Sequence, residues 1–292
     1  MTASSGSSVA ASLPSAGSGT LDADWMLQCQ ARHDLPPARP RVPLALAIGR
    51  DAGRVVGSLE PELATELAGT GRLRRGPGSA WHLEVRSAAD VNSAWAALAD
   101  SLLRAGRVSG WRGELLDVLD ADGDRCGAIE RAAVRALGMS TRAVHLVLSD
   151  PAGHVWVQQR ALDKAVDPGL WDTTVGGLVA AGESIETTLE RETWEEAGLR
   201  PVQFGRAEPF GRFTVRRPVA DGYMVEHIDM FRAVAAPGVV PRNQDGEVAG
   251  FECLARAELI ERIRAGVFTG EAALVLAHWS LAANQEAGPG NS

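Results

Sequence analysis

The stretch "GGLVAAGESIETTLERETWEEAGL", residues 176–199, is the most informative segment of the sequence for predicting the fold. Ser184 is a residue type that caps the start of helices, and Gly198 is a residue type that ends them. The spacing therefore predicts a helix of about three turns between these two residues. Its second half carries four glutamates, a single arginine, Arg191, and no lysine. Such a concentration of negative charge on two turns requires a physical explanation.

Three of these glutamates, Glu192, Glu195 and Glu196, are spaced i, i+3 and i+4, so their carboxylates share one face of the predicted helix. Like charges repel at this spacing, and the C-terminal end of a helix disfavours anions. A solvated acidic face is the alternative, but such a face normally includes lysines. Mg²⁺ takes oxygen ligands and bridges them to substrate phosphates, so the pattern favours a metal site. Arg191 can pair with Glu183, immediately before the helix, and hold the ligands in register.

The composition sets the broad class of the protein. The chain has 292 residues, of which 45% are hydrophobic, and its net charge of −8 argues against a general nucleic-acid or membrane surface. It contains no apolar run long enough to span a membrane. Cys29, Cys126 and Cys253 are widely spaced and odd in number, so we expect reduced thiols in a cytoplasmic protein. The oligomeric state is left open between a monomer and a homodimer.

The chain divides into four parts. We expect disordered tails at residues 1–20 and 287–292, an N-terminal α+β domain at 21–110 and a second domain at 111–286. Trp111, Arg112 and Glu114, at the join, are expected to form a packed interdomain contact. In the N-terminal domain the pattern predicts strands at 42–49 and 53–59, helices at 60–70 and 87–106, and a loop at 70–81. In the second domain it predicts hairpins within 114–130 and 143–160, strands at 210–217, 222–234 and 249–255, and helices at 257–266 and 270–284.

One acidic cluster resembles a calcium loop. Asp120, Asp122 and Asp124 have the spacing of such a loop. Its sixth position, where Gly is needed, is Arg125, and its twelfth position, where Glu is needed, is Arg131. The Asp-Gly pair within the cluster is instead typical of a hairpin turn, which we predict here.

The opening stretch resembles the Nudix box, which is G, five residues, E, seven residues, R-E, an apolar residue, any residue, E-E, any residue, G and an apolar residue. One position departs from the pattern, because Thr193 stands at the apolar position after the R-E pair. The resemblance implies a complete Nudix domain from about Glu114 to Asn284. It also implies an α/β fold with a mixed β-sheet sandwiched between helices, here preceded by the smaller α+β domain, and hydrolysis of a diphosphate linked to another group. The other fixed positions are filled by Gly177, Glu183, Arg191, Glu192, Glu195, Glu196, Gly198 and Leu199.

The box suggests roles for its residues. Glu192, Glu196 and Glu195 are the expected ligands of Mg²⁺ or Mn²⁺, which would neutralise the diphosphate and lower the pKa of an attacking water. Gly177 can add a backbone carbonyl, since glycine permits close approach to a ligand. Arg191 is grouped with the catalytic residues because it orients these ligands. Structural roles within the box are expected for Glu183 and Gly198.

A second resemblance concerns the segment ahead of the box. "VQQRALDKAVDPGLWDTTVGG" is similar to the corresponding segment of the isopentenyl diphosphate isomerases, which are a branch of the Nudix proteins. Isomerases of that type need a cysteine before the box and a metal-binding histidine just beyond it. Gly176 and Leu178 occupy the matching positions here, and neither side chain can protonate an alkene or bind a metal. An isomerase activity is therefore a minor alternative.

The catalytic base has three candidates. Glu195 belongs to the box, and Glu226 aligns with a strand carboxylate that binds metal in the isomerase branch. Glu247 precedes a predicted strand and is the alternative to Glu226 as the base. Glu226 could equally be a surface residue, and Glu247 could be a turn residue beside an Asp-Gly pair. His145 matches a position shared by the isomerase branch and the larger Nudix hydrolases near it, but a lone histidine is more often a packed residue than a ligand.

Four further residues are candidates for contacts with the substrate. Arg160 and Lys164 precede the box and can contact phosphate, although a solvated loop is the alternative. Trp171 and Tyr223 can stack on an aromatic ring. Packing in the core is the competing explanation for Trp171.

A third resemblance covers most of the chain. It is to the Nudix proteins related to thiamin pyrophosphokinase, in which an N-terminal domain of undefined function precedes the hydrolase. It implies removal of phosphate from thiamin diphosphate or its damaged oxo forms, which yields the monophosphate. The alternatives are a general hydrolase of ADP-ribose or nucleoside diphosphate derivatives and a non-catalytic ligand sensor. The segments that carry this third resemblance are "RVVGSLEPELATEL", "GRVSGWRGELLDVL", "IERAAVRALGM", "VHLVL" and "PRNQDGEVAGFECL".

Overall fold

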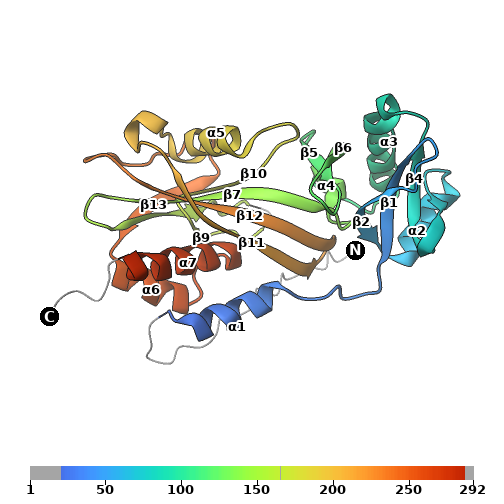
Figure 1. The fold of residues 1–292 in the computed structure, drawn as a ribbon. Coiled ribbons are helices and arrows are strands. Elements are labelled where there is room, and N and C mark those ends of the chain that lie inside the picture. The colour runs from blue at the N-terminus through green and yellow to red at the C-terminus, as the bar shows by residue number, and fades with distance from the viewer. Residues whose placement is uncertain (1–20, 165, 287–292) are drawn as a thin grey trace, which may run out of the picture.

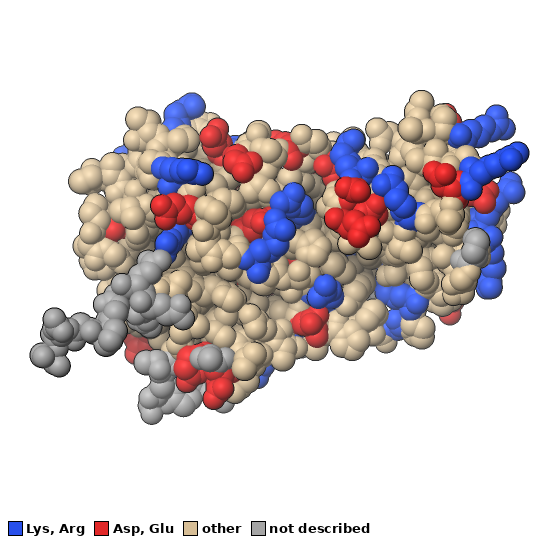
Figure 2. Space-filling model, in the orientation of Figure 1, with Lys and Arg blue, Asp and Glu red and all other residues tan. Residues whose placement is uncertain are grey.

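The computed structural model describes residues 21–164 and 166–286. Figure 1 shows a small sheet with two helices at one end of the molecule and a larger sheet, covered by helices on both faces, at the other. The tails expected at residues 1–20 and 287–292 lie outside the described residues. On the face drawn in Figure 2, acidic and basic side chains lie beside one another across the middle of the molecule.

The small sheet has the strand order β2-β1-β4-β3, in which β1 and β4 are parallel and the other pairs are antiparallel. Both helices predicted for this region are present, and Ser87 and Asp90 form the capping box before the second. The stretch at 70–81, predicted as a loop, also contains the two-residue strand β3 and a 3₁₀ turn. The elements are β1 (Val42–Ile48), β2 (Arg54–Leu59), α2 (Pro61–Gly69), β3 (Arg74–Arg75), η1 (Pro77–Ser79), β4 (Trp81–Val85), η2 (Ala88–Asp90) and α3 (Val91–Arg104).

The large sheet is mixed, with the order β11-β12-β7-β8-β13. Strand β10 also pairs with β7, and β9 pairs with β8. The pair β7 and β12 is parallel, whereas the others are antiparallel. The strands are β7 (Ser140–Ser149), β8 (Val155–Arg160), β9 (Trp171–Asp172), β10 (Val175–Leu178), β11 (Glu208–Val219), β12 (Gly222–Val234) and β13 (Val248–Leu254).

Helices cover both faces of this sheet (Figure 1). One face packs against α5, and the other packs against α7, with α1 and α6 alongside. Because the strands are buried between two apolar layers, the architecture is the predicted mixed sheet between helices. The helices are α1 (Ala23–His33), α5 (Ile185–Ala197), α6 (Arg256–Arg264) and α7 (Gly270–Glu286), with a 3₁₀ turn, η3 (Pro201–Gln203).

The region between the two sheets packs with the small one. It comprises the hairpin of β5 (Leu115–Leu119) and β6 (Arg125–Glu130), followed by α4 (Arg131–Val134). Its buried side chains belong to the same apolar core as α3, and the Trp95 indole donates a hydrogen bond to the Cys126 carbonyl at 3.0 Å. Helix α1 packs instead on α7, across the boundary that the sequence suggested at residue 110. The division at residue 110 stays a prediction.

The acidic cluster between β5 and β6 is a hairpin turn, as predicted. Oδ1 of Asp120 accepts hydrogen bonds from the backbone N–H groups of Asp122 (3.1 Å) and Asp124 (2.9 Å). In the described part of the chain, no helix combines the length and the apolar character needed to cross a membrane. The three cysteines form no disulfide there, and only Cys253 is exposed.

Candidate active site

The helix predicted between Ser184 and Gly198 is α5. Oγ of Ser184 accepts a hydrogen bond from the backbone N–H of Thr187 at 3.1 Å, which caps its start. At its end Gly198 adopts a left-handed conformation with φ of 64°. A Cβ atom at this position would lie 2.7 Å from the Arg242 carbonyl oxygen. Glycine is therefore required here by backbone conformation and by space.

Arg191 organises the acidic residues around α5. Its Nε and Nη2 atoms donate to Glu183 at 3.0 and 2.9 Å, which confirms the predicted ion pair. Its Nη1 atom contacts Glu192 at 2.8 Å and Glu195 at 3.1 Å. Nη2 also donates to the Leu178 carbonyl at 3.3 Å, which connects the helix to β10. One guanidinium thus sets the positions of three carboxylates and a strand end.

Glu196 is buried at the junction of the helix and the sheet. Its Oε2 atom accepts hydrogen bonds from the Gly176 backbone N–H at 2.9 Å and from Nε2 of Gln158 at 3.0 Å. Burial and the neighbouring charge of Glu192 raise the pKa of Glu196 to about 8. No cationic side chain forms an ion pair with this carboxyl group among the described residues.

Glu192 occupies a similar environment one turn earlier. Burial raises its pKa to about 7, although the charge of Arg191 acts in the opposite direction. Gly177, on β10, faces it so closely that a Cβ atom there would lie 2.0 Å from the Glu192 carboxyl carbon. The glycine of the box is therefore needed to make room for this carboxylate.

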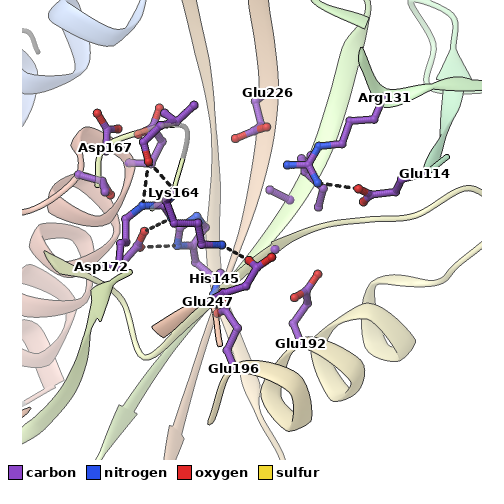
Figure 3. Close-up of a pocket in the computed structure, with 18 of the residues that line it drawn as sticks. Glu114, Arg131, His145, Lys164, Asp167, Asp172, Glu192, Glu196, Glu226 and Glu247 are labelled. Carbon is purple, nitrogen blue, oxygen red and sulfur yellow. Dashed lines mark hydrogen bonds and ion pairs between the residues drawn. The ribbon is translucent and has the colours of Figure 1, made fainter. Parts of the chain in front are cut away.

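Glu192, Glu195 and Glu196 line a cleft of about 490 Å³, into which Figure 3 shows Glu192 and Glu196 projecting. Arg191 and Gly177 also line this cleft. So do Glu226 and Glu247, the two candidates for the general base that lie outside the box. Glu226 extends from β12 on the side opposite Glu192 and Glu196. Further cationic side chains that line the cleft are Arg112, Arg131, Arg135, Arg160, Lys164 and Arg217.

The comparisons with known proteins identify the family. A family model described as NUDIX domain matches residues 139–272. The chain is 32% identical over 149 residues to the isopentenyl-diphosphate Delta-isomerase of Streptomyces griseus subsp. griseus, an alignment that covers 51% of this chain and 74% of that protein. This chain belongs to the Nudix family.

Two further proteins resemble this Nudix chain over a part of its length. An uncharacterised Nudix hydrolase of Pseudomonas aeruginosa is 40% identical over 105 residues, which is 36% of this chain and 60% of the relative. The chain thus matches less than two thirds of that protein. The crystal structure of DR0079 from Deinococcus radiodurans covers 56% of this chain and 97% of its own, with a TM-score of 0.47 and 24% identity.

The two base candidates outside the box, Glu226 and Glu247, differ in their surroundings. Glu226 accepts a hydrogen bond from Oγ1 of Thr141 at 3.1 Å, and burial together with the charge of Glu271 raises its pKa. Glu247 is bound instead to the ammonium group of Lys164, whose pKa is lowered by burial. The carboxyl group of Glu226 therefore lacks the ion pair that Glu247 has.

Residues of β7, β8 and β9 form another wall of the Nudix cleft. Nδ1 of His145 lies 2.8 Å from Oγ1 of Thr173, and burial lowers its pKa, so the ring is a packed, neutral group near pH 7. Arg160 lines the cleft, and its guanidinium contacts Asp172 at 3.4 Å and the Val166 carbonyl at 2.9 Å, so its contact with phosphate stays a prediction.

The structure places Trp171 and Tyr223 outside the cleft lining, which departs from the expectation that they stack on a substrate ring. The hydroxyl of Tyr223 donates to the Leu35 carbonyl at 2.9 Å, so this side chain fixes the segment that follows α1. The Trp171 ring packs with the core on the α7 side, and the Arg262 guanidinium lies 5.4 Å from its centre.

Several lining residues were not assigned by the sequence analysis. Arg131 and Glu114 come from the region between the sheets, and their side chains form an ion pair at 2.8 Å in the cleft, whereas Glu114 was expected only as part of an interdomain contact, which stays a prediction. Glu271, at the start of α7, pairs with Arg217 of β11 at 2.9 Å. The alternation of side chains along β11 was the one local pattern that could have predicted Arg217 as a lining residue. The other lining residues reach the cleft through contacts between distant parts of the chain, which no local pattern predicts.

The box residues fit a hard divalent cation. Glu192, Glu195 and Glu196 offer only oxygen atoms, which are the ligands that Mg²⁺ and Mn²⁺ prefer. Burial raises the pKa values of Glu192 and Glu196, and a bound cation would favour the charged form of both carboxyl groups. Arg191 contacts Glu192 and Glu195, so a cation bound by both would compete with these hydrogen bonds.

Proposed function

We propose that this Nudix protein is a divalent-cation-dependent hydrolase that cleaves an organic diphosphate. The observation that carries the proposal is the buried carboxyl group of Glu196, which lines a cleft with Glu192 and Lys164 but forms no direct ion pair with a cationic side chain among the described residues. Burying an ionised carboxylate costs on the order of several kcal/mol of desolvation free energy, unless a cation compensates its charge. Mg²⁺ or Mn²⁺ is the cofactor that these oxygen donors would select.

Each side chain has a distinct task in this reaction. When bound, the cation supplies positive charge to the diphosphate and lowers the pKa of an attacking water. Glu196 is held by Gly176 and Gln158, so it presents its carboxylate in a fixed direction. Arg191 orients Glu192 and Glu195 through its Nη1 atom.

We assign the general base to Glu226, with Glu195 and Glu247 as its rivals. Its raised pKa brings proton acceptance closer to neutral pH, whereas Glu247 is engaged by Lys164. Glu226 also extends into the cleft opposite the box carboxylates (Figure 3). A Glu226→Gln variant should lose turnover while its Mg²⁺ dependence is unchanged.

For the substrate we propose thiamin diphosphate or its oxo forms, hydrolysed to the monophosphate by a monomer or homodimer in the cytoplasm. The support is the resemblance to the Nudix proteins related to thiamin pyrophosphokinase, which includes segments of both sheets. The domain limits of 21–110 and 111–286 are part of this proposal. ADP-ribose and nucleoside diphosphate derivatives are the alternative substrates.

The isomerase alternative conflicts with the site. Gly176 stands where that branch needs a cysteine, and a Cβ atom at this position would lie 2.9 Å from Cε1 of His145. A cysteine would therefore have to displace the histidine. A non-catalytic sensor is disfavoured because every acidic position of the box is retained.

The proposal is tested by a hydrolysis screen with purified protein and Mg²⁺, in which chromatography detects both inorganic phosphate and phosphate monoesters, because cleavage of ADP-ribose gives two monoesters and no free phosphate. The substrates are thiamin diphosphate, its oxo forms, ADP-ribose and nucleoside diphosphates, and Glu196→Gln serves as the inactive control. Hydrolysis of the thiamin compounds at rates at least about tenfold above the others would support the substrate assignment. Hydrolysis of ADP-ribose alone would replace that assignment but keep the hydrolase, and no hydrolysis of any diphosphate would contradict both.

A further inference from the structure

A second group of metal-binding side chains lies away from the cleft. Asp150, His154 and Cys253 offer a carboxylate oxygen, an imidazole nitrogen and a sulfur atom that all lie within 4.8 Å of one another. None of the three lines the cleft. Asp150 follows β7 five residues beyond His145, which corresponds to roughly 16 Å along an extended strand. We propose that this group binds a transition-metal ion such as Zn²⁺, independently of the cleft.

Two of the donors are held by the turn between β7 and β8. Oδ1 of Asp150 accepts hydrogen bonds from the backbone N–H groups of Ala152 at 2.9 Å and His154 at 2.8 Å. The second oxygen, Oδ2, is thereby directed at Nδ1 of His154, which lies 3.0 Å away. The carboxylate and the imidazole are thus oriented before any ion binds, which lowers the entropy cost of binding.

The third donor comes from the neighbouring strand. Cys253 pairs with Trp156 in the antiparallel register of β13 and β8. His154 precedes Trp156 by two residues, so its side chain leaves the same face of the sheet as that of Cys253. Diagonal neighbours on one face of a sheet are within reach of each other's side chains. The thiol is free and exposed, so an ion can reach it from solvent.

The mixture of donors selects a particular class of ion. Zn²⁺ accepts sulfur, nitrogen and oxygen ligands together, usually four in number, whereas Mg²⁺ prefers oxygen alone. Three protein donors and a solvent molecule would complete such a site. Because binding requires the thiolate, it releases a proton and becomes stronger as the pH rises. The ion differs in class from the one proposed for the cleft.

A purely structural explanation makes a different prediction. The contact between Asp150 and His154 also stabilises the hairpin turn, and that role does not involve Cys253. A metal site needs the thiolate as well, so the two explanations are separated by the cysteine. Cys29 and Cys126 are buried and serve as internal controls for nonspecific thiol chemistry.

The test is a titration of the full-length reduced protein with Co²⁺, which shows a thiolate-to-metal charge-transfer band only when sulfur is a ligand. We expect one equivalent of Co²⁺ to produce the band and one equivalent of Zn²⁺ to remove it. Cys253→Ser should abolish the band, and His154→Ala should weaken Zn²⁺ binding by at least about tenfold. Glu192→Gln, in the cleft, should leave both unchanged. Absence of the band in the wild type, or its persistence in Cys253→Ser, would overturn the proposal.

Discussion

The carboxylate of Glu196 and the backbone N–H of Gly176 are joined by a 2.9 Å hydrogen bond that connects α5 to β10. This contact places the last acidic residue of the box against the sheet rather than in solvent. The helix therefore buries a carboxyl group that forms no direct ion pair among the described residues, which is why we propose a bound cation beside it. Its consequences can be measured.

The metal-free protein should lose stability as the pH rises. The pKa of Glu192 is raised from 4.5 to about 7 and that of Glu196 from 4.5 to about 8, so the folded state binds these protons more tightly than the unfolded state. Their ionisation therefore costs stability from about pH 4.5, and the full cost is present above about pH 8. Melting temperatures in EDTA should fall over this range relative to a Glu196→Gln variant, and Mg²⁺ should reduce the fall. Equal pH profiles for the two proteins would contradict the burial of this charge.

Gly177→Ala should impair metal binding without unfolding the protein. The new methyl group would overlap the Glu192 carboxylate, whose carbon would lie 2.0 Å from the added Cβ. We expect Mn²⁺ affinity, measured by calorimetry, to drop by about tenfold or more. Gly250→Ala is the matched control, because a Cβ at this strand position meets no atom within 4 Å. Wild-type affinity in Gly177→Ala would show that the site tolerates a side chain there.

Thr193→Val should stabilise the protein. Thr193 is the one departure from the box pattern, it is fully buried, and its Oγ1 atom has no hydrogen-bond partner among the described residues. Replacing an unpaired buried hydroxyl by a methyl group removes a desolvation penalty of about 1–3 kcal/mol. Denaturant unfolding should therefore give a free energy higher by about 1 kcal/mol, with turnover unchanged. A loss of stability would reveal a polar contact that the fold needs.

Arg131→Met should weaken substrate binding more than it changes metal dependence. Arg131 and Glu114 bring a charged pair from outside the large sheet into the cleft. We expect KM for the preferred diphosphate to rise about three- to tenfold, roughly 1 kcal/mol, while the Mg²⁺ concentration for half-maximal rate is unchanged. Arg54→Met is the control, since Arg54 forms a similar pair with Asp120 away from the cleft. Substitution is preferable to deletion of residues 1–110, which would also remove α1 from its contacts with α7.

The sequence predicted the parts of the site that depend on local spacing. The cap at Ser184, the left-handed Gly198 and the shared face of the glutamates follow from the geometry of one helix. Residues that reach the cleft through tertiary contacts, such as Arg131 and Glu271, have no local signal. Aromatic side chains were assigned to the substrate by type alone, and Tyr223 packs instead against the segment after α1. Helix α1 was not predicted, because its apolar residues are buried only through contact with α7 and the sheet.

The most direct test of the metal site is the rate of Mg²⁺-dependent diphosphate hydrolysis by Glu196→Gln, measured beside its thermal stability. The amide oxygen can still accept hydrogen bonds from Gly176 and Gln158, so the fold should survive while the charge is lost. The account predicts turnover reduced by at least about a hundredfold, roughly 3 kcal/mol, with metal-free stability equal to or above that of the wild type. Hydrolysis at the wild-type rate by a folded Glu196→Gln protein would contradict the assignment of these carboxylates to a metal ion.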